Sequence, residues 1–147
     1  IISNGILKTY LHSYSTAKKF STSTTGNAGI ISPAAFQISM DAGRKTLEDM
    51  ISETKNGIFI GNSWYLRFQD ERNGLFSTVP RDGVYHIVNG KFAEEWNGLR
   101  VSESFPGLLK RIMDVSTERK RIKWWNEIMP SQLPFVKIGE VNISKAF

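Results

Sequence analysis

The Asn-Gly dipeptide occurs five times in this chain, at residues 4–5, 56–57, 73–74, 89–90 and 97–98. A two-residue type I′ turn needs positive φ angles at both central positions, which makes this dipeptide the strongest short signal for a β-hairpin. Five such signals indicate a series of antiparallel strands with short connections. We therefore predict an α+β fold that is rich in β-structure, with a largely antiparallel sheet and two or three short helices.

Segment 58–68 has the clearest strand pattern in the sequence. Apolar side chains recur at alternate positions, interrupted by Asn62, and a more polar set occupies the positions between them. Because successive residues of a strand point to opposite faces, this pattern predicts a long half-buried strand. The predicted buried face carries Ile58, Ile60, Trp64, Leu66 and Phe68.

Four further strands are predicted. Residues 84–88 and 91–94 flank Asn89-Gly90 and predict a hairpin, and residues 135–143 predict a last strand. Residues 6–12 predict a strand after Asn4-Gly5, yet only three residues precede that turn. Since this hairpin lacks most of its first arm and there is no initiating Met, we expect a C-terminal part of a longer protein, with residues 1–147 forming one domain.

Short helices are predicted in three places. Thr46 supplies a hydroxyl N-cap with Asp49 three residues later, so a helix should begin there and end before Gly57. A second helix is predicted from Pro106 to about Asp114, and a weaker third from 14 to 20. The buried stripe expected for the second helix is Leu108, Leu109, Ile112 and Met113.

Composition limits the class of protein. A chain of 147 residues with 40% hydrophobic content can form one domain with a core. The sequence has no cysteine, which excludes disulfides and thiolate metal ligands and favours a reducing compartment such as the cytoplasm. No apolar run approaches the roughly 20 residues needed to span a bilayer, so no membrane association is expected.

Catalytic signals are scarce. The two histidines, His12 and His86, lie in separate predicted strands and in no HExxH pair, so packing or solvation is the simpler interpretation of each. The paired acids at 48–49, 70–71 and 94–95 cannot share a proton on a strand, because neighbouring side chains point to opposite faces.

The loop STSTTGNAG, residues 21–29, could hold a ligand through its backbone amides. It lacks the GK[ST] ending of a phosphate-binding loop and no convincing helix follows it. A tight bend whose exposed amides bind the backbone of a peptide is the better interpretation. The candidate peptide-binding residues are Ser23, Thr25, Gly26 and Asn27.

The stretch ERKRIKWW, residues 118–125, concentrates the basic character of the chain. It could form a groove in which cations meet phosphates and a tryptophan stacks on a base, or a cationic surface whose tryptophans pack inwards. No recognised nucleic-acid-binding motif accompanies it, and a net charge of +5 is modest, which favours the second interpretation. The candidate basic or partner-contacting residues are Arg119, Lys120, Arg121, Lys123, Trp124 and Trp125.

The order of segments resembles the C-terminal domain of the TldD/PmbA family, also known as modulators of DNA gyrase. The matching pieces are SNGILKTYLHSYSTAKKF, STTGNAG, DAGRKTLEDMI, NGIFIG, NGLFS and VYHIVNGKFAEEWNGLRV, followed by a helix and a closing strand. The resemblance covers residues 4–144. One departure is Asn73-Gly74-Leu75-Phe76-Ser77, which lacks the acid of the TGDFS-like turn of the family.

The resemblance implies a zinc-dependent peptidase family that works as a two-subunit assembly. In catalytic members, an upstream HExxxH helix supplies two zinc ligands and a general base, and a cysteine near the C-terminus supplies a third ligand. By alignment that cysteine would lie within residues 126–132, which read NEIMPSQ here. The resemblance leaves open whether the full-length protein carries HExxxH, and hence whether it is an enzyme.

The implied role is that of the non-catalytic, PmbA-like or TldE-like subunit. Such a subunit would complete a chamber with a homologous, zinc-bearing TldD-like subunit, or as a homodimer, and would help to hold an extended peptide by β-augmentation. No cofactor is expected in this chain itself. Residues 118–125 would then serve as scaffold or subunit contact.

Two other functions are compatible with the residues alone. One is a nucleic-acid or DNA-gyrase-linked binding module that uses residues 118–125. The other is a structural domain whose sheet edge dimerises.

Overall fold

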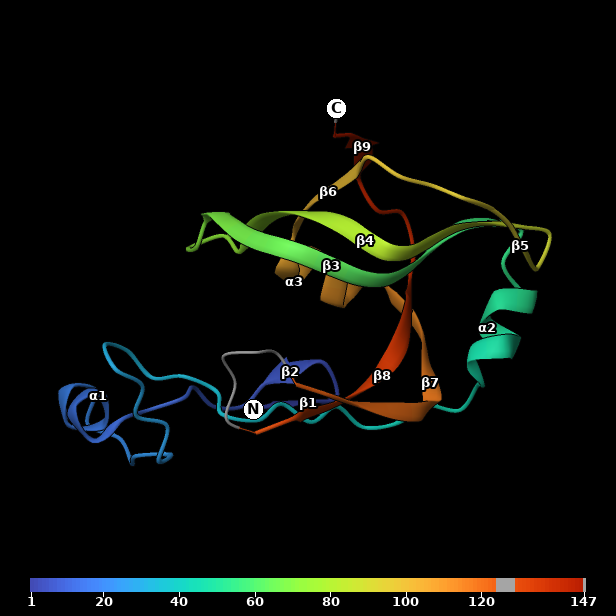
Figure 1. The fold of residues 1–147 in the computed structure, drawn as a ribbon. Helices are drawn as coiled ribbons and strands as arrows, with labels where there is room; N and C mark the ends of the chain where they lie inside the picture. The colour runs from blue at the N-terminus through green and yellow to red at the C-terminus, as the bar shows by residue number, and fades with distance from the viewer. Residues whose placement is uncertain (124–128, 147) are drawn as a thin grey trace. The chain divides into compact units, whose positions relative to one another are not determined.

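The computed structural model describes residues 1–123 and 129–146. They form strands and short helices in an α+β arrangement that is mostly antiparallel β-sheet, as predicted (Figure 1). The strands are β1 (Ile2–Ser3), β2 (Ile6–Leu7), β3 (Asn56–Asp70), β4 (Leu75–Val88), β5 (Lys91–Glu95), β6 (Leu99–Ser104), β7 (Ile112–Ile122), β8 (Ser131–Ile138) and β9 (Ile143–Lys145). The helices are α1 (Tyr14–Lys19), α2 (Leu47–Ser52) and α3 (Phe105–Lys110). Within the described ranges, no helix is long and apolar enough to cross a membrane.

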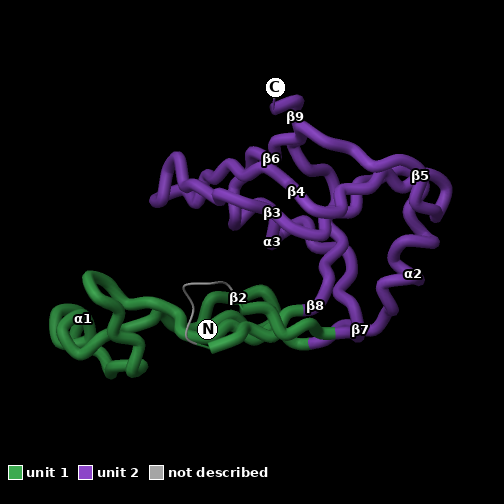
Figure 2. The backbone as a smooth tube through the Cα atoms, viewed as in Figure 1, with its two compact units in different colours: residues 1–41, 119–133 green, residues 42–118, 134–147 purple. Residues whose placement is uncertain are grey.

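The chain forms two compact units, coloured separately in Figure 2. Unit 1 consists of residues 1–41 and 119–133, and unit 2 of residues 42–118 and 134–147. Strands β7 and β8 pair with each other and contribute residues to both units. Unit 1 therefore combines two segments that are far apart in the sequence.

Unit 2 is built on a five-stranded sheet. Its strands follow the order β3-β4-β6-β9, and β5 also pairs with β4. Neighbouring strands of this sheet pair antiparallel, and the β3–β4 hairpin is the longest pairing, running from Asn56 opposite Val88 to Asp70 opposite Leu75. The buried apolar side chains of this unit are Met50, Phe76, Val84, Ile87 and Val101.

Two of the five Asn-Gly pairs form the predicted turn with positive φ at both residues. Asn89 and Gly90 have φ angles of 48° and 79° between β4 and β5, and Asn4 and Gly5 have φ angles of 50° and 72° between β1 and β2. At residues 73–74 and 97–98 only the glycine has positive φ. The pair at 56–57 was wrongly predicted as a turn, because it lies inside β3 and pairs with Val88 and Ile87.

The prediction of a single buried face along residues 58–68 is wrong for the second half of this segment, which lies within β3. The register with β4 shifts three times, between residues 60 and 62, 64 and 67, and 68 and 70, and each shift breaks the alternation of faces. As a result Leu66 and Phe68 are 44% and 51% exposed. On the face predicted to be polar, Phe59 contacts Phe92 and Phe135, with ring centroids 5.4 Å and 6.2 Å away.

Two of the three predicted helices are confirmed. The hydroxyl of Thr46 accepts a hydrogen bond from the N–H of Asp49, and the Asp49 carboxylate accepts one from the N–H of Thr46, which completes a capping box at the start of α2. Hydrogen bonding to Thr46 lowers the pKa of Asp49. Helix α1 occupies the predicted range and begins at the N-cap Ser13.

The helix predicted for 106–114 is shorter than expected. It ends at Lys110, and Ile112 and Met113 belong to strand β7, so they extend no helical stripe. Met113 is 64% exposed. Pairing of β7 with β8 outweighs the local helical pattern, a tertiary effect that periodicity does not report.

Two predicted strands have different limits in the structure. The strand predicted for 6–12 ends at Leu7, and the N–H of Lys8 donates a last hydrogen bond to the carbonyl of Ile1. His12 therefore lies outside any strand. The strand predicted for 135–143 is interrupted around Glu140, whose φ is 37°, and divides into β8 and β9.

Ser116 joins three segments of unit 2. Its side chain is fully buried, its hydroxyl donates to the carbonyl of Glu118 and accepts from the N–H of Phe135, and its carbonyl accepts from the N–H of Gly43. Glu118 in turn accepts a hydrogen bond from the N–H of Leu47, at the start of α2. These bonds attach residues 43–47 to β7 in parallel register.

Glu103 on β6 is expected to make unit 2 sensitive to acid. Its carboxylate accepts hydrogen bonds from the N–H of Asn142 at 2.8 Å and from the guanidinium of Arg111 at 2.6 Å, and mainly because of the Asn142 bond its pKa lies below the usual 4.5. The stabilisation is present above the pKa of the unfolded chain and is lost as pH falls through the lower pKa of the folded state. We predict that Glu103→Gln lowers the free energy of unfolding by about 1.5 kcal/mol at pH 7.

The pH dependence provides the check. In urea unfolding, the difference between Glu103→Gln and the parent protein should narrow as the pH is lowered below the usual pKa of 4.5. Glu95→Gln, at an exposed position of β5, is the matched control and should change stability little at either pH. If the difference in free energy of unfolding between Glu103→Gln and the parent protein stays constant on acidification, the charge of this carboxylate contributes nothing to stability.

Candidate functional site

The loop at residues 21–27 folds around the backbone of His12 in unit 1. The N–H of His12 donates to the hydroxyl of Thr25 at 2.7 Å, and the carbonyl of His12 accepts from the hydroxyls of Thr24 and Thr25 and from the N–H groups of Thr25 and Asn27. Gly26 has a φ of 74° and donates its N–H to the Thr24 hydroxyl. Thr25, one of the predicted peptide-binding residues, therefore uses its hydroxyl and its N–H within the chain.

The other candidates of this loop include Asn27 and Ser23, which have different surroundings. The side-chain amide of Asn27 donates to the carbonyl of Ala34 at 3.1 Å, and the N–H of Ala34 donates back to the carbonyl of Asn27. Ser23 lines an open hollow of about 340 Å³ beside α1. Of the four candidates, Ser23 is the one that faces a hollow, while Thr25, Gly26 and Asn27 shape the loop.

A larger open groove of about 700 Å³, lined in part by His12, lies within unit 1. The side chain of Phe20 is tilted against the His12 ring, with centroids 6.1 Å apart, and the ammonium of Lys19 lies 5.4 Å above the Phe20 ring. The His12 ring also contacts the hydroxyl of Thr16 through Nδ1. The groove is lined by Lys8, Thr9, Tyr10, Leu11, His12, Thr16, Phe20, Thr22 and Pro33.

Backbone groups in this groove are available for pairing. Among the described residues, no hydrogen bond joins the N–H groups of Thr9, Tyr10 or Leu11 to any other segment. These residues directly follow the short β1–β2 hairpin. N–H groups of this kind can donate hydrogen bonds to the carbonyls of an added peptide strand.

Sequence reasoning missed the residues of the groove. It placed residues 8–12 in a strand and gave no role to Lys8, Tyr10 or Phe20. One signal could have identified the region, since the first 40 residues contain three lysines and no acidic residue. Tyr10 and Phe20 are 68% and 63% exposed, so both rings are accessible to a ligand in the groove.

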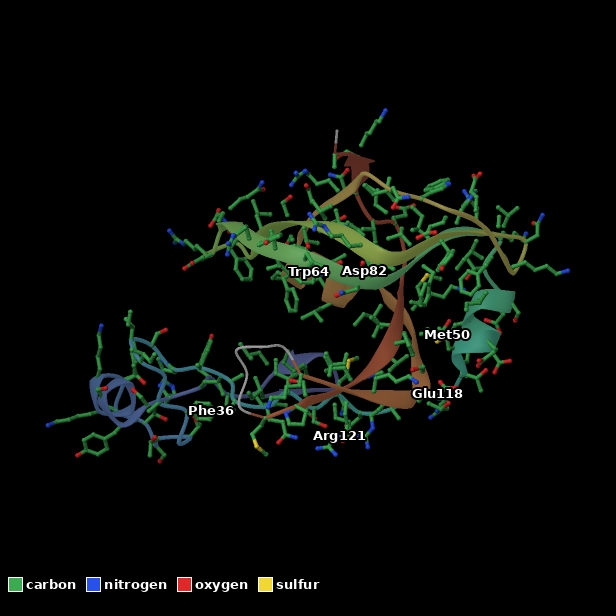
Figure 3. The ribbon with its side chains drawn as sticks, in the orientation of Figure 1. Phe36, Met50, Trp64, Asp82, Glu118 and Arg121 are labelled. Carbon is green, nitrogen blue, oxygen red and sulfur yellow. The ribbon has the colours of Figure 1, made fainter. Side chains whose placement is uncertain are left out.

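The basic stretch is divided between two faces. Residues 118–122 form the end of β7, so Arg119 and Arg121 point to one face and Lys120 to the other. Arg121, labelled in Figure 3, is exposed, as are Arg119, Lys120 and Lys123. Trp124 and Trp125 lie outside the described residues. The stretch therefore places its cations on both sides of the strand.

No metal-binding group occurs in the part of the chain that the structure describes. No three His, Cys, Asp or Glu side chains gather there, and the sequence contains no cysteine. His86 lies in β4, where its ring stacks on Trp96 with centroids 4.4 Å apart and its Nε2 contacts the side-chain oxygen of Asn56 at 2.7 Å. His12 belongs to unit 1 and His86 to unit 2. The described donor set does not fit zinc.

The described part of segment 126–132 serves a structural purpose. The hydroxyl of Ser131 accepts a hydrogen bond from the N–H of Ile38 and is buried. Gln132 donates its N–H to the carbonyl of Ile38 and accepts from the N–H of Met40, in parallel register with Ser39. Ser131 and Gln132 thus attach residues 38–40 to β8 within unit 1.

Unit 1 exposes many large apolar side chains. Ile30 and Ile31 are 104% and 98% exposed, and Phe36, labelled in Figure 3, is 44% exposed. The described core of this unit is small, with Ala17 as its buried apolar residue. Exposed apolar surface on this scale is typical of a contact with further polypeptide.

Comparison with known proteins gives a family. A model of the PmbA/TldA metallopeptidase C-terminal domain matches residues 1–145. Metalloprotease MJ0996 from Methanocaldococcus jannaschii is 40% identical over 99 residues, which cover 64% of this chain and 22% of that protein.

Solved structures share the fold. The chain superposes on a candidate modulator of a DNA gyrase from Thermotoga maritima with a TM-score of 0.82 and 24% identity, covering 97% of this chain and 32% of that one. Its likeness to TldE from Thermococcus kodakarensis has a TM-score of 0.83 at 21% identity, covering 97% and 33%. The chain thus spans about a third or less of the length of these relatives.

Proposed function

We propose that this chain, which belongs to the PmbA/TldD metallopeptidase family and matches the C-terminal domain of that family, is part of a non-catalytic subunit. Such a subunit would complete a peptide-binding chamber with a homologous, zinc-bearing subunit. It would hold an extended peptide while the partner cleaves it. The observation that carries this proposal is the family match over residues 1–145 in a chain that has no cysteine.

The residues near the C-terminus support the non-catalytic assignment. Within residues 129–132, Ser131 and Gln132 use their hydrogen bonds to hold residues 38–40. A hydroxyl occupied in this way is a poor replacement for a thiolate, which binds zinc as an anion. The zinc of the assembly is therefore assigned to the partner subunit.

The loop and groove of unit 1 support the peptide-holding role. Of the loop candidates Ser23, Thr25, Gly26 and Asn27, Thr25 and Asn27 bond to the backbone of His12, which lines the same groove as residues 9–11. A peptide that adds as a strand would pair with the N–H groups of residues 9–11, and its side chains would contact the groove. The exposed apolar side chains of unit 1 would be covered by the partner or by the ligand.

Residues 119–125 are assigned to scaffold or subunit contact. Cations on both faces of β7 do not form the single positive track that follows a phosphate backbone. This arrangement favours the peptidase-family role over nucleic-acid binding.

A reconstitution assay tests the proposal. The full-length protein is mixed with its zinc-bearing homologue from the same organism, and cleavage of an unfolded peptide is followed by mass spectrometry. We expect no cleavage by this protein alone, and more cleavage by the mixture than by the homologue alone. Cleavage by this protein alone, or an unchanged rate on mixing, would contradict the proposal.

The same assay tests the loop. Thr25→Ala should reduce the stimulation, because it removes the hydroxyl that holds both the N–H and the carbonyl of His12. Thr117→Ala, at an exposed position of β7, is the matched control and should leave the stimulation unchanged. Equal stimulation by both variants would exclude the loop from peptide binding.

A further inference from the structure

The net charge of the chain resides in unit 1. Residues 1–41 and 119–133 contain seven Lys or Arg and two acidic residues, a net charge of +5, which equals that of the whole chain. Unit 2 has twelve of each sign. Unit 2 folds with no net charge, so folding does not require an excess of cations. The positive charge of unit 1 therefore points to a ligand rather than to stability.

The groove of unit 1 lies in a segment that contains three lysines and no acidic residue, residues 1–40. Lys8 lines the groove, Lys18 lines the adjacent hollow, and Lys19 lies over the Phe20 ring at the edge of the groove. None of the residues that line either hollow is acidic, and no acidic residue precedes Asp41 in the sequence. The side chains here lack intramolecular carboxylate partners among the described residues.

From this charge distribution we infer that the groove selects an acidic peptide segment, in which Asp or Glu residues alternate with apolar ones. Carboxylates of the peptide meet Lys8, Lys18 and Lys19, and its apolar side chains contact Tyr10 and Phe20. The inference rests on the proposed function, and it names the class of peptide that the site takes.

Two observations favour a peptide over a nucleic acid as the anionic ligand. The N–H groups of residues 9–11, which have no partner among the described residues, match the carbonyls of an added peptide strand. The ammonium of Lys19 lies 5.4 Å from the centroid of the Phe20 ring, so a base that stacks on this ring would compete with it. A peptide needs only the edge of such a ring.

Fluorescence anisotropy on the full-length protein tests the inference. The probes are a fluorescein-labelled peptide of Glu, Leu and Ser, matched peptides in which Gln or Lys replaces each Glu, and labelled oligothymidylate. The acidic peptide should bind most tightly, and its affinity should fall as salt is raised. The combined variant Lys8→Gln, Lys18→Gln, Lys19→Gln should weaken this binding about tenfold, at roughly twofold to threefold for each exposed charge contact.

The control is a variant with the same loss of charge in unit 2. Lys91→Gln, Lys110→Gln and Lys145→Gln combined should leave the affinity for the acidic peptide unchanged, since these exposed residues belong to the other unit. An equal loss with both triple variants would overturn the inference, because it would show an effect of net charge alone.

The remaining outcomes separate the inference from the proposed function. Equal binding of the acidic, neutral and basic peptides overturns the acidic selectivity and leaves the peptide-holding role in place. Binding of none of the peptides contradicts both. Tighter binding of oligothymidylate than of the acidic peptide, weakened by the unit 1 variant, overturns the inference in favour of a nucleic acid.

Discussion

Replacement of Gly43 by Ala is expected to lower the free energy of unfolding by about 3 kcal/mol or more. The N–H of Gly43 donates to the carbonyl of Ser116, which brings its backbone directly against β7. A Cβ at this position would collide with the carbonyl oxygen of Val115 and lie 2.6 Å from its carbonyl carbon. Because these are backbone atoms of a paired strand, they cannot rotate away.

The consequence extends beyond one contact. Displacement of residue 43 would break the parallel pairing of Lys45 with Ser116 and with it the attachment of α2 through Glu118. In thermal unfolding followed by circular dichroism, we expect a midpoint lower by about 10 °C for a chain of this length. Gly107→Ala is the control, because its Cβ would meet only ordinary contacts at 3.5 Å or more in α3 and should be neutral or stabilising. Similar stability of the two variants would refute the close approach.

Replacement of Gly90 by Ala is expected to cost about 3 kcal/mol, from two separate causes. Its φ of 79° disfavours a residue with a Cβ by about 1–2 kcal/mol. Its Cβ would also lie 2.5 Å from the carbonyl oxygen of Ser52, the last residue of α2. The turn docks there through hydrogen bonds from the N–H groups of Asn89 and Gly90 to the carbonyls of Lys55 and Thr54.

The chain offers a matched control in which only one of these causes operates. Gly5 occupies the same position of an Asn-Gly turn, with a φ of 72°, and a Cβ there would meet nothing within 4 Å. Gly5→Ala should therefore cost only the backbone strain, and urea unfolding of both variants separates strain from crowding. An equal loss at the two positions would mean that the contact between the β4–β5 turn and α2 contributes nothing.

Features determined by neighbouring residues could be predicted from the sequence. The turn at Asn89-Gly90 and the capping box of Thr46 and Asp49 need only a few consecutive residues, and both are confirmed. The helix predicted to reach Asp114 is wrong beyond Lys110, because β7 pairs with a strand from another part of the chain. The register shifts of β3 likewise depend on its partner β4, so Leu66 and Phe68 could not be recognised as exposed.

The candidate site was only partly predictable for the same reason. The loop at 21–29 could be recognised as a polar bend, but its bonds join residues 13 apart, to His12. The groove forms only when Lys8, Phe20 and Pro33 come close together in the folded chain. A pattern of neighbouring residues in the sequence cannot predict such a contact. The division into units requires residues 119–133 to associate with residues 1–41, and this association is also long-range.

Zinc content of the purified full-length protein is the most direct test of the non-catalytic assignment. The protein is loaded with zinc, passed over a desalting column and measured by inductively coupled plasma mass spectrometry beside its zinc-bearing homologue. The account predicts stoichiometric zinc in the homologue and only trace zinc in this protein. Stoichiometric zinc retained by this protein alone would contradict it.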